Sequence, residues 1–103
     1  MQTVLSLTDF NQKMAGHEHV ALFVHNPEDE LSRCAFRSIT EANYLSQTTV
    51  VYIADVSQVH DIHTAYQITI TPALLFFVNG KLVNVLSGCQ ESDYLKALMN
   101  TNL

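Results

Sequence analysis

Several residue types are scarce in this chain of 103 residues, and each scarcity excludes a class of protein. There is no tryptophan, and there are only three glycines and two prolines. The chain is therefore neither a low-complexity sequence nor a protein with glycine-rich phosphate loops. Its longest apolar run, 73–78, is far shorter than the roughly 20 residues of a membrane-spanning helix. We expect a globular protein that binds no nucleotide and spans no membrane.

Positive charge is scarce as well. Five Lys and Arg residues stand against ten Asp and Glu, which gives a formal net charge of −5, and the basic residues form no run. Nucleic acids and anionic membrane surfaces bind to clustered basic residues, so neither is an expected partner. Residues 1–5 lack the basic start and the apolar stretch of a signal peptide, which predicts a cytoplasmic location.

Cysteine is limited to Cys34 and Cys89, which lie far apart in the sequence. Two cysteines are too few for the disulfide framework of a small secreted protein, and a reducing cytoplasm is again the expected compartment. The length and the apolar content of 48% predict a single domain over residues 1–103.

The residues that are present alternate between strand-like and helix-like segments. Thr8 is the expected cap of the first helix, which ends at Gly16. Asn79-Gly80 predicts a two-residue hairpin turn. Strands that alternate with helices favour a sheet covered by helices on both faces. The expected strands are 3–7, 19–24, 48–54, 73–78 and 81–86, and the later helices lie at 27–45, within 55–66, and at 91–100.

The clearest helix start lies at Asn26 and Pro27. Asparagine is a favoured cap, proline suits the first helical position, and the acidic residues 28–30 complement the helix dipole. We therefore expect a helix that begins at Pro27 and is capped by Asn26. Helical spacing predicts that its buried face contains Leu31, Ala35, Ile39 and Ala42.

One stretch resembles the thioredoxin family. Thr71-Pro72 precedes an apolar strand, the Asn79-Gly80 turn follows it, and Gly88 comes next. In thioredoxins a cis-proline opens this strand and a glycine closes the groove beside it. Counted from Pro72, the resemblance runs without a gap from Phe23 to Gly88. It implies an α/β thioredoxin-like fold, a central mixed sheet of about five strands flanked by about four helices on both faces.

The resemblance fails at the residues that carry thioredoxin chemistry. The family's Cys-x-x-Cys motif falls on Glu28–Leu31, so both of its sulfurs are replaced. The family's buried acid becomes Leu22, its lysine becomes Ile53, and its tryptophan becomes Pro27. Carboxylates at 28–30 also raise the pKa of a nearby thiol, which opposes nucleophilic chemistry. The resemblance therefore predicts that dithiol exchange at this place has been lost.

These departures lead us to expect a redox-inactive, thioredoxin-like module that binds an unknown polypeptide partner. The backbone before the proline pairs with an extended partner segment in the resembled family. No cofactor or metal is expected, and the chain is expected to be a monomer or a weak dimer. The predicted groove residues are Thr71, Pro72, Gly88 and Cys89, with Glu28 and Asp29 at the acidic tip.

The alternative is a thiol–disulfide oxidoreductase or redox sensor, involved in cell redox homeostasis, that uses Cys89 with or without Cys34. Cys34 falls on the apolar stripe of its helix and is expected to face the core, whereas Cys89 is expected to be an exposed, reactive thiol. A disulfide between them requires Cα atoms within about 7 Å, which leaves this pairing open. A second alignment also stays open: it inserts three residues and places Leu31–Cys34 on the Cys-x-x-Cys motif.

Two histidine pairs and one acidic cluster raise the question of a metal site. His17 and His19 lie in a different connection from His60 and His63, and neither pair has a cysteine beside it. Zinc sites usually take four ligands from converging segments, so we expect surface histidines. Helix capping accounts for the acidic cluster 28–30 without a cation.

Overall fold

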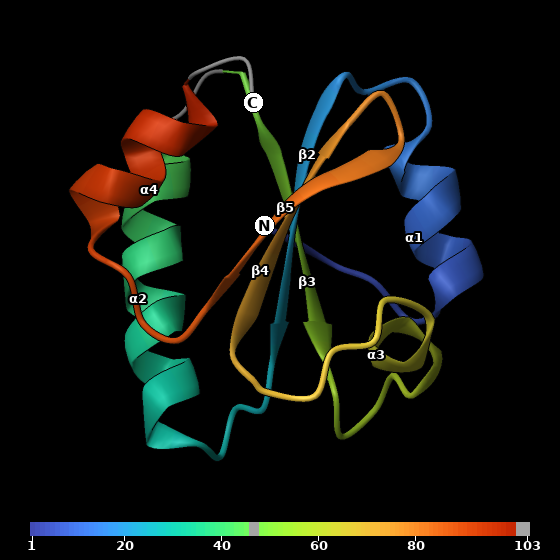
Figure 1. The fold of residues 1–103 in the computed structure, drawn as a ribbon, viewed down its shortest axis with the longest axis horizontal. Helices are drawn as coiled ribbons and strands as arrows, with labels where there is room; N and C mark the ends of the chain where they lie inside the picture. Colours follow the sequence, from blue (N-terminus) through green and yellow to red (C-terminus); the bar gives the residue numbers. More distant parts are fainter. Residues whose placement is uncertain (46–47, 101–103) are drawn as a thin grey trace.

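The computed structural model describes residues 1–45 and 48–100, in which a five-stranded sheet lies between two layers of helices (Figure 1). The strands are β1 (Gln2–Thr3), β2 (His19–His25), β3 (Val50–Asp55), β4 (Ala73–Val78) and β5 (Lys81–Ser87). The helices are α1 (Leu7–Met14), α2 (Glu30–Leu45), α3 (Asp61–Ala65) and α4 (Ser92–Met99). The central mixed sheet predicted from the sequence is confirmed.

The strand order is β1-β3-β2-β4-β5, with β2 at the centre. β3 runs parallel to β1 and β2, whereas β4 is antiparallel to both β2 and β5. His25 lies opposite Asp55, Val24 opposite Ala73, and Ala73 opposite Ser87. The ends of β2, β3 and β5 and the start of β4 therefore meet at one end of the sheet.

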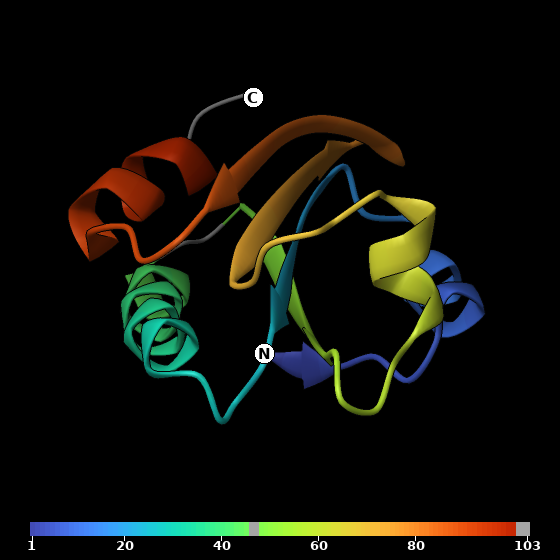
Figure 2. The same ribbon diagram turned by 60° about the horizontal axis from the view of Figure 1, so that its bottom comes forward.

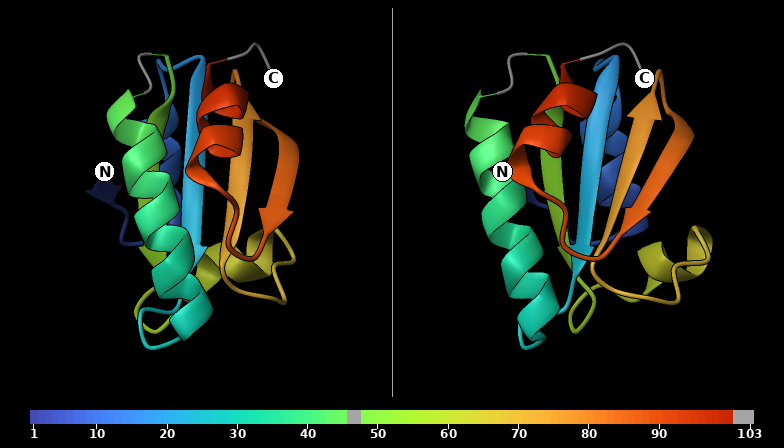
Figure 3. Two further views of the ribbon diagram at one scale, coloured as in Figure 1. Left: turned by 90° about the vertical axis from the view of Figure 1, so that its left-hand side faces the viewer. Right: turned by 60° about the vertical axis from the view of Figure 1, so that its left-hand side comes forward.

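Each face of the sheet is covered by two helices. α1 and α3 lie on one face, and α2 and α4 lie side by side on the other (Figures 2 and 3). The core under α1 and α3 includes Phe10 and Phe77, and the core under α2 and α4 includes Phe23, Ile39 and Phe76. Both layers are thus fixed by burial of apolar side chains. Among the described residues, no helix has the length and apolar character needed to cross a membrane.

The β4–β5 hairpin forms as predicted. Asn79 has φ +50° and Gly80 has φ +82°, the left-handed conformations that a two-residue turn of this kind requires. The Asn79 N–H donates to the Glu18 carbonyl over 2.8 Å, which attaches the hairpin to the segment before β2. The Thr71–Pro72 peptide bond before β4 is cis, as the resemblance to thioredoxins implies.

The first helix begins earlier than its predicted cap. Ser6, not Thr8, is the N-cap: its Oγ accepts from the Asp9 N–H over 3.0 Å. The Asp9 carboxylate accepts in return from the Leu5 N–H over 2.8 Å. This exchange resembles a capping box and ends the extended chain before Ser6, so β1 is much shorter than the predicted strand 3–7.

The second helix begins later than predicted, at Glu30 rather than Pro27. Asn26 instead holds a turn: its side-chain oxygen accepts from the Glu28 N–H, and its carbonyl accepts from the Asp29 N–H. Asparagine supports such turns as readily as helix caps, which is why the prediction was wrong. In the first turn of α2 the buried residue also differs from the predicted one. Leu31 is 47% exposed and Ser32 is fully buried, while Ala35, Ile39 and Ala42 are buried as predicted.

Candidate active site

A disulfide bond joins Cys34 of α2 to Cys89 of the loop between β5 and α4. The two sulfurs are 2.05 Å apart and the two Cα atoms 5.7 Å apart. Both residues are half-buried, at the surface of the core under α2 and α4. Neither cysteine is free. The prediction that Cys89 is a lone, exposed thiol is therefore wrong. The prediction that Cys34 only packs in the core is wrong as well.

The backbone of the β5–α4 loop places Cys89 beside α2. Gly88 has φ +79°, a conformation that favours glycine, and its N–H donates to the Pro72 carbonyl over 3.0 Å. The loop then passes α2 on its way to α4 (Figure 1). Ser38, one turn beyond Cys34 in α2, lies with its Oγ 3.8 Å from Cys89 Sγ. The disulfide therefore lies next to the cis-proline segment, with a hydroxyl group beside one of its sulfurs.

The predicted groove residues are brought together only in part. Pro72 is buried, and Thr71 and Gly88 are half-buried at the same end of the sheet as Cys89. Glu28 and Asp29 lie in the turn between the end of β2 and α2. Their described hydrogen bonds are with residues of this turn and of the first part of α2: Asn26, Leu31 and Arg33.

His25, at the end of β2, is a residue of this region that the sequence reasoning missed. Its ring stacks on Phe23, with centroids 5.0 Å apart, and on Phe36, with centroids 6.1 Å apart. Burial lowers the pKa of His25, and the nearby Asp55 carboxylate opposes this shift. Burial raises the pKa of Asp55, but hydrogen bonds from Ser57 and the charge of His25 outweigh it, and the net shift is downward. In the sequence, His25 directly follows the predicted apolar strand 19–24, and this position could have identified it as a residue of this region.

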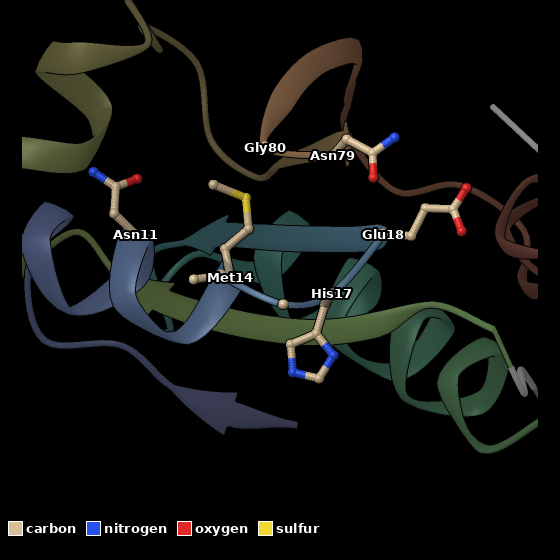
Figure 4. A pocket seen from close by; sticks show the side chains of 8 residues that line it. Asn11, Met14, His17, Glu18, Asn79 and Gly80 are labelled. Carbon is tan, nitrogen blue, oxygen red and sulfur yellow. The ribbon is translucent and has the colours of Figure 1, made fainter.

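The opposite end of the sheet carries a depression without comparable chemistry. It lies between the α1–β2 connection and the hairpin, and its lining includes Met14, His17, Glu18 and Asn79 (Figure 4). Figure 4 shows Met14 extending toward the hairpin and the His17 ring pointing away from it. Over residues 1–45 and 48–100, no group of three or more His, Cys, Asp or Glu side chains is arranged to hold a metal ion.

Solved structures of thioredoxins closely resemble this chain. A thioredoxin mutant from Halobacterium salinarum is 21% identical, with a TM-score of 0.88, and the match covers 99% of this chain and 91% of that chain. Thioredoxin from Plasmodium falciparum is 22% identical, with a TM-score of 0.81, and 96% of each chain is covered. Thioredoxin from Fasciola hepatica is 18% identical, with a TM-score of 0.82 and coverage of 95% and 96%. These likenesses establish a thioredoxin-like fold. No protein-family model and no curated protein matches the sequence.

The expectation of a redox-inactive binding module is contradicted. It depended on the alignment that placed the family motif on Glu28–Leu31, where neither sulfur is present. The structure instead pairs Cys34 with Cys89 in a thioredoxin-like fold, beside the cis-proline segment. These findings favour the alternative interpretation, a thiol–disulfide protein that uses both cysteines.

Proposed function

We propose that this protein performs thiol–disulfide exchange through Cys34 and Cys89. The observation that carries the proposal is the bond between these cysteines at the end of the sheet where Pro72 and Gly88 lie. A purely core disulfide would be sealed from reductants, whereas both residues of this pair are only half-buried. A thiolate from a partner can therefore attack one sulfur and form a mixed disulfide, the step by which disulfides are exchanged.

The surroundings of the pair favour slow exchange rather than rapid turnover. Cys34 lies in the second turn of α2, where the helix dipole stabilises a thiolate less than at the first residue. The carboxylates of Glu28 and Glu30, just before and at the first residue of the helix, precede Cys34 in sequence. Leu22 stands where thioredoxins carry a buried acid, so this proton acceptor is missing. A cysteine pair that exchanges slowly suits a redox sensor or a specialised oxidoreductase.

Trapping the mixed disulfide tests this proposal. In Cys89→Ser, the thiol of Cys34 has no internal partner and is expected to accumulate an adduct with an added aryl disulfide. In Cys34→Ser, the same adduct is expected on Cys89. The wild-type protein, once reduced, is expected to release the aryl thiol and to close its own disulfide, as followed by mass spectrometry.

The matched control is the Cys34→Ser/Cys89→Ser double variant, which must form no adduct. Two results would reject the proposal: a wild-type disulfide that thiols reduce only after the protein is unfolded, or mixed disulfides that never resolve in the wild-type protein. Either result would show that this disulfide is a structural cross-link.

A further inference from the structure

Both arginines of this acidic chain lie on α2 next to Cys34. Arg33 precedes Cys34 and Arg37 follows it by three residues. Together with His25, Pro27 and Phe36, the two arginines line a notch of about 380 Å³. This volume lies within the range of small-molecule sites, about 300–1,000 Å³.

The two guanidinium groups differ in their freedom. Arg33 Nη1 donates to the carbonyls of Glu28, over 3.0 Å, and Pro27, over 3.4 Å, so this side chain is held against the turn before α2. Arg37 makes no hydrogen bond or ion pair with any residue of the described part of the chain. Arg37 is therefore an available cation at the edge of the notch, and Arg33 is a cation fixed beside it.

The geometry of the helix relates Arg37 to the disulfide. At 3.6 residues per turn, Ser38 and Arg37 lie on opposite sides of Cys34 along the helix surface. Ser38 contacts Cys89 Sγ, so Cys89 lies on the Ser38 side of Cys34. A thiolate that attacks Cys34 Sγ approaches in line with the breaking bond, from the side away from Cys89. This approach crosses the surface that carries Arg37.

We propose that Arg37 and Arg33 form an anion subsite that directs small, carboxylate-bearing thiols to Cys34. The inference rests on the proposed exchange function. The incoming thiolate forms a bond to Cys34 Sγ, the Cys34–Cys89 bond breaks, and Cys89 leaves as a thiolate beside the Ser38 hydroxyl. A second substrate thiolate then attacks the substrate sulfur of the mixed disulfide and releases Cys34. Two substrate thiols are oxidised to one disulfide, and their two protons go to the two cysteine thiolates.

The negative charge of the rest of the molecule repels a carboxylate-bearing thiol, so such a substrate needs the two arginines to approach Cys34 readily. The formal net charge is −5, and the acidic residues 28–30 precede the arginines on the same side of the fold. These carboxylates repel an anionic thiol, and this repulsion is screened by salt. Without Arg37, an anionic thiol would therefore react more slowly than a neutral thiol of equal nucleophilicity.

A series of three small thiols tests the subsite. Mercaptoacetate is anionic, 2-mercaptoethanol is neutral and cysteamine is cationic. The measured quantity is the second-order rate constant for reduction of the Cys34–Cys89 bond at low ionic strength, expressed per thiolate. We expect Arg37→Gln to lower the ratio of the mercaptoacetate rate to the 2-mercaptoethanol rate by about threefold, the effect of one unit charge at about 6 Å in a water-like medium. The ratio of the cysteamine rate to the 2-mercaptoethanol rate should rise. In 1 M salt, Arg37→Gln should change neither ratio.

Lys81→Gln is the matched control, because it removes the same charge from the start of β5, at the far end of the sheet. Arg37→Lys should retain most of the wild-type ratio. The subsite is overturned if Lys81→Gln changes the ratios as much as Arg37→Gln, or if Arg37→Gln changes all three rates by one common factor. Failure of every thiol to reduce the native disulfide would overturn the exchange function itself, and the subsite with it.

Discussion

At the scale of single residues, the environment of His25 links protonation to folding. Its ring stacks on those of Phe23 and Phe36, which also contact each other, and burial lowers its pKa despite the opposing charge of Asp55. The unfolded chain therefore binds a proton to this histidine more readily than the folded chain does. This contribution to stability is fully present above the unfolded pKa of about 6.5 and is lost as the pH falls toward the lower folded value.

We predict that His25→Phe removes this pH dependence and keeps the ring contacts. The free energy of unfolding of the wild-type protein should fall between about pH 7 and pH 5, and the variant should lose less over the same range. Urea denaturation at both pH values measures the difference. Two results would contradict the link between His25 and the pH dependence. One is an equal loss of unfolding free energy in the two proteins, and the other is an NMR titration of His25 with a midpoint at or above about pH 6.5.

At the scale of elements, the starts of α1 and α2 show where local sequence is ambiguous. Ser6 and Thr8 are both acceptable caps by residue type, and only the exchange of hydrogen bonds with Asp9 selects Ser6. Asn26 likewise serves a turn rather than the helix that follows it. By contrast, the Asn79-Gly80 hairpin was predictable, because its backbone conformation admits few residue types.

The two candidate caps of α1 can be separated by mutation. Ser6→Ala removes the oxygen that accepts from the Asp9 N–H and should lower the free energy of unfolding by about 1 kcal/mol. Thr8→Ala is the matched control and should change it by less than about 0.5 kcal/mol, as exposed substitutions usually do. The denaturant midpoints of the two variants test this, and a larger loss in Thr8→Ala would restore the cap predicted from the sequence.

At the scale of the whole molecule, the disulfide connects parts of the chain that are 55 positions apart in sequence and only 5.7 Å apart at their Cα atoms. The thioredoxin-like order of strands and helices was predictable from the alternation of apolar segments and from the stretch around Pro72. The pairing of Cys34 with Cys89 was not, because it depends on the start of α2 and on the path of the β5–α4 loop. The start of α2 follows the turn that Asn26 holds, and the path of the loop is set by tertiary contacts such as the bond from Gly88 to Pro72.

Reduction of the disulfide should destabilise the fold. A cross-link across this separation restricts the unfolded chain and contributes about 2–4 kcal/mol. The free energy of unfolding should therefore fall by that amount when reductant is added. The Cys34→Ser/Cys89→Ser double variant should already be as unstable as the reduced protein and should not respond to reductant. Equal stability of the oxidised and reduced wild-type proteins would show that the bond does not constrain the chain.

The most direct test of the account is the reduction potential of the Cys34–Cys89 pair in the native protein. Equilibration in a series of thiol–disulfide buffers, followed by acid quenching, alkylation and mass spectrometry, gives the fraction reduced at each potential. An exchange function predicts one reversible two-electron transition between about −120 and −270 mV, the range of proteins that exchange disulfides. A pair that stays oxidised in the folded protein below about −300 mV would contradict the account and mark the bond as structural.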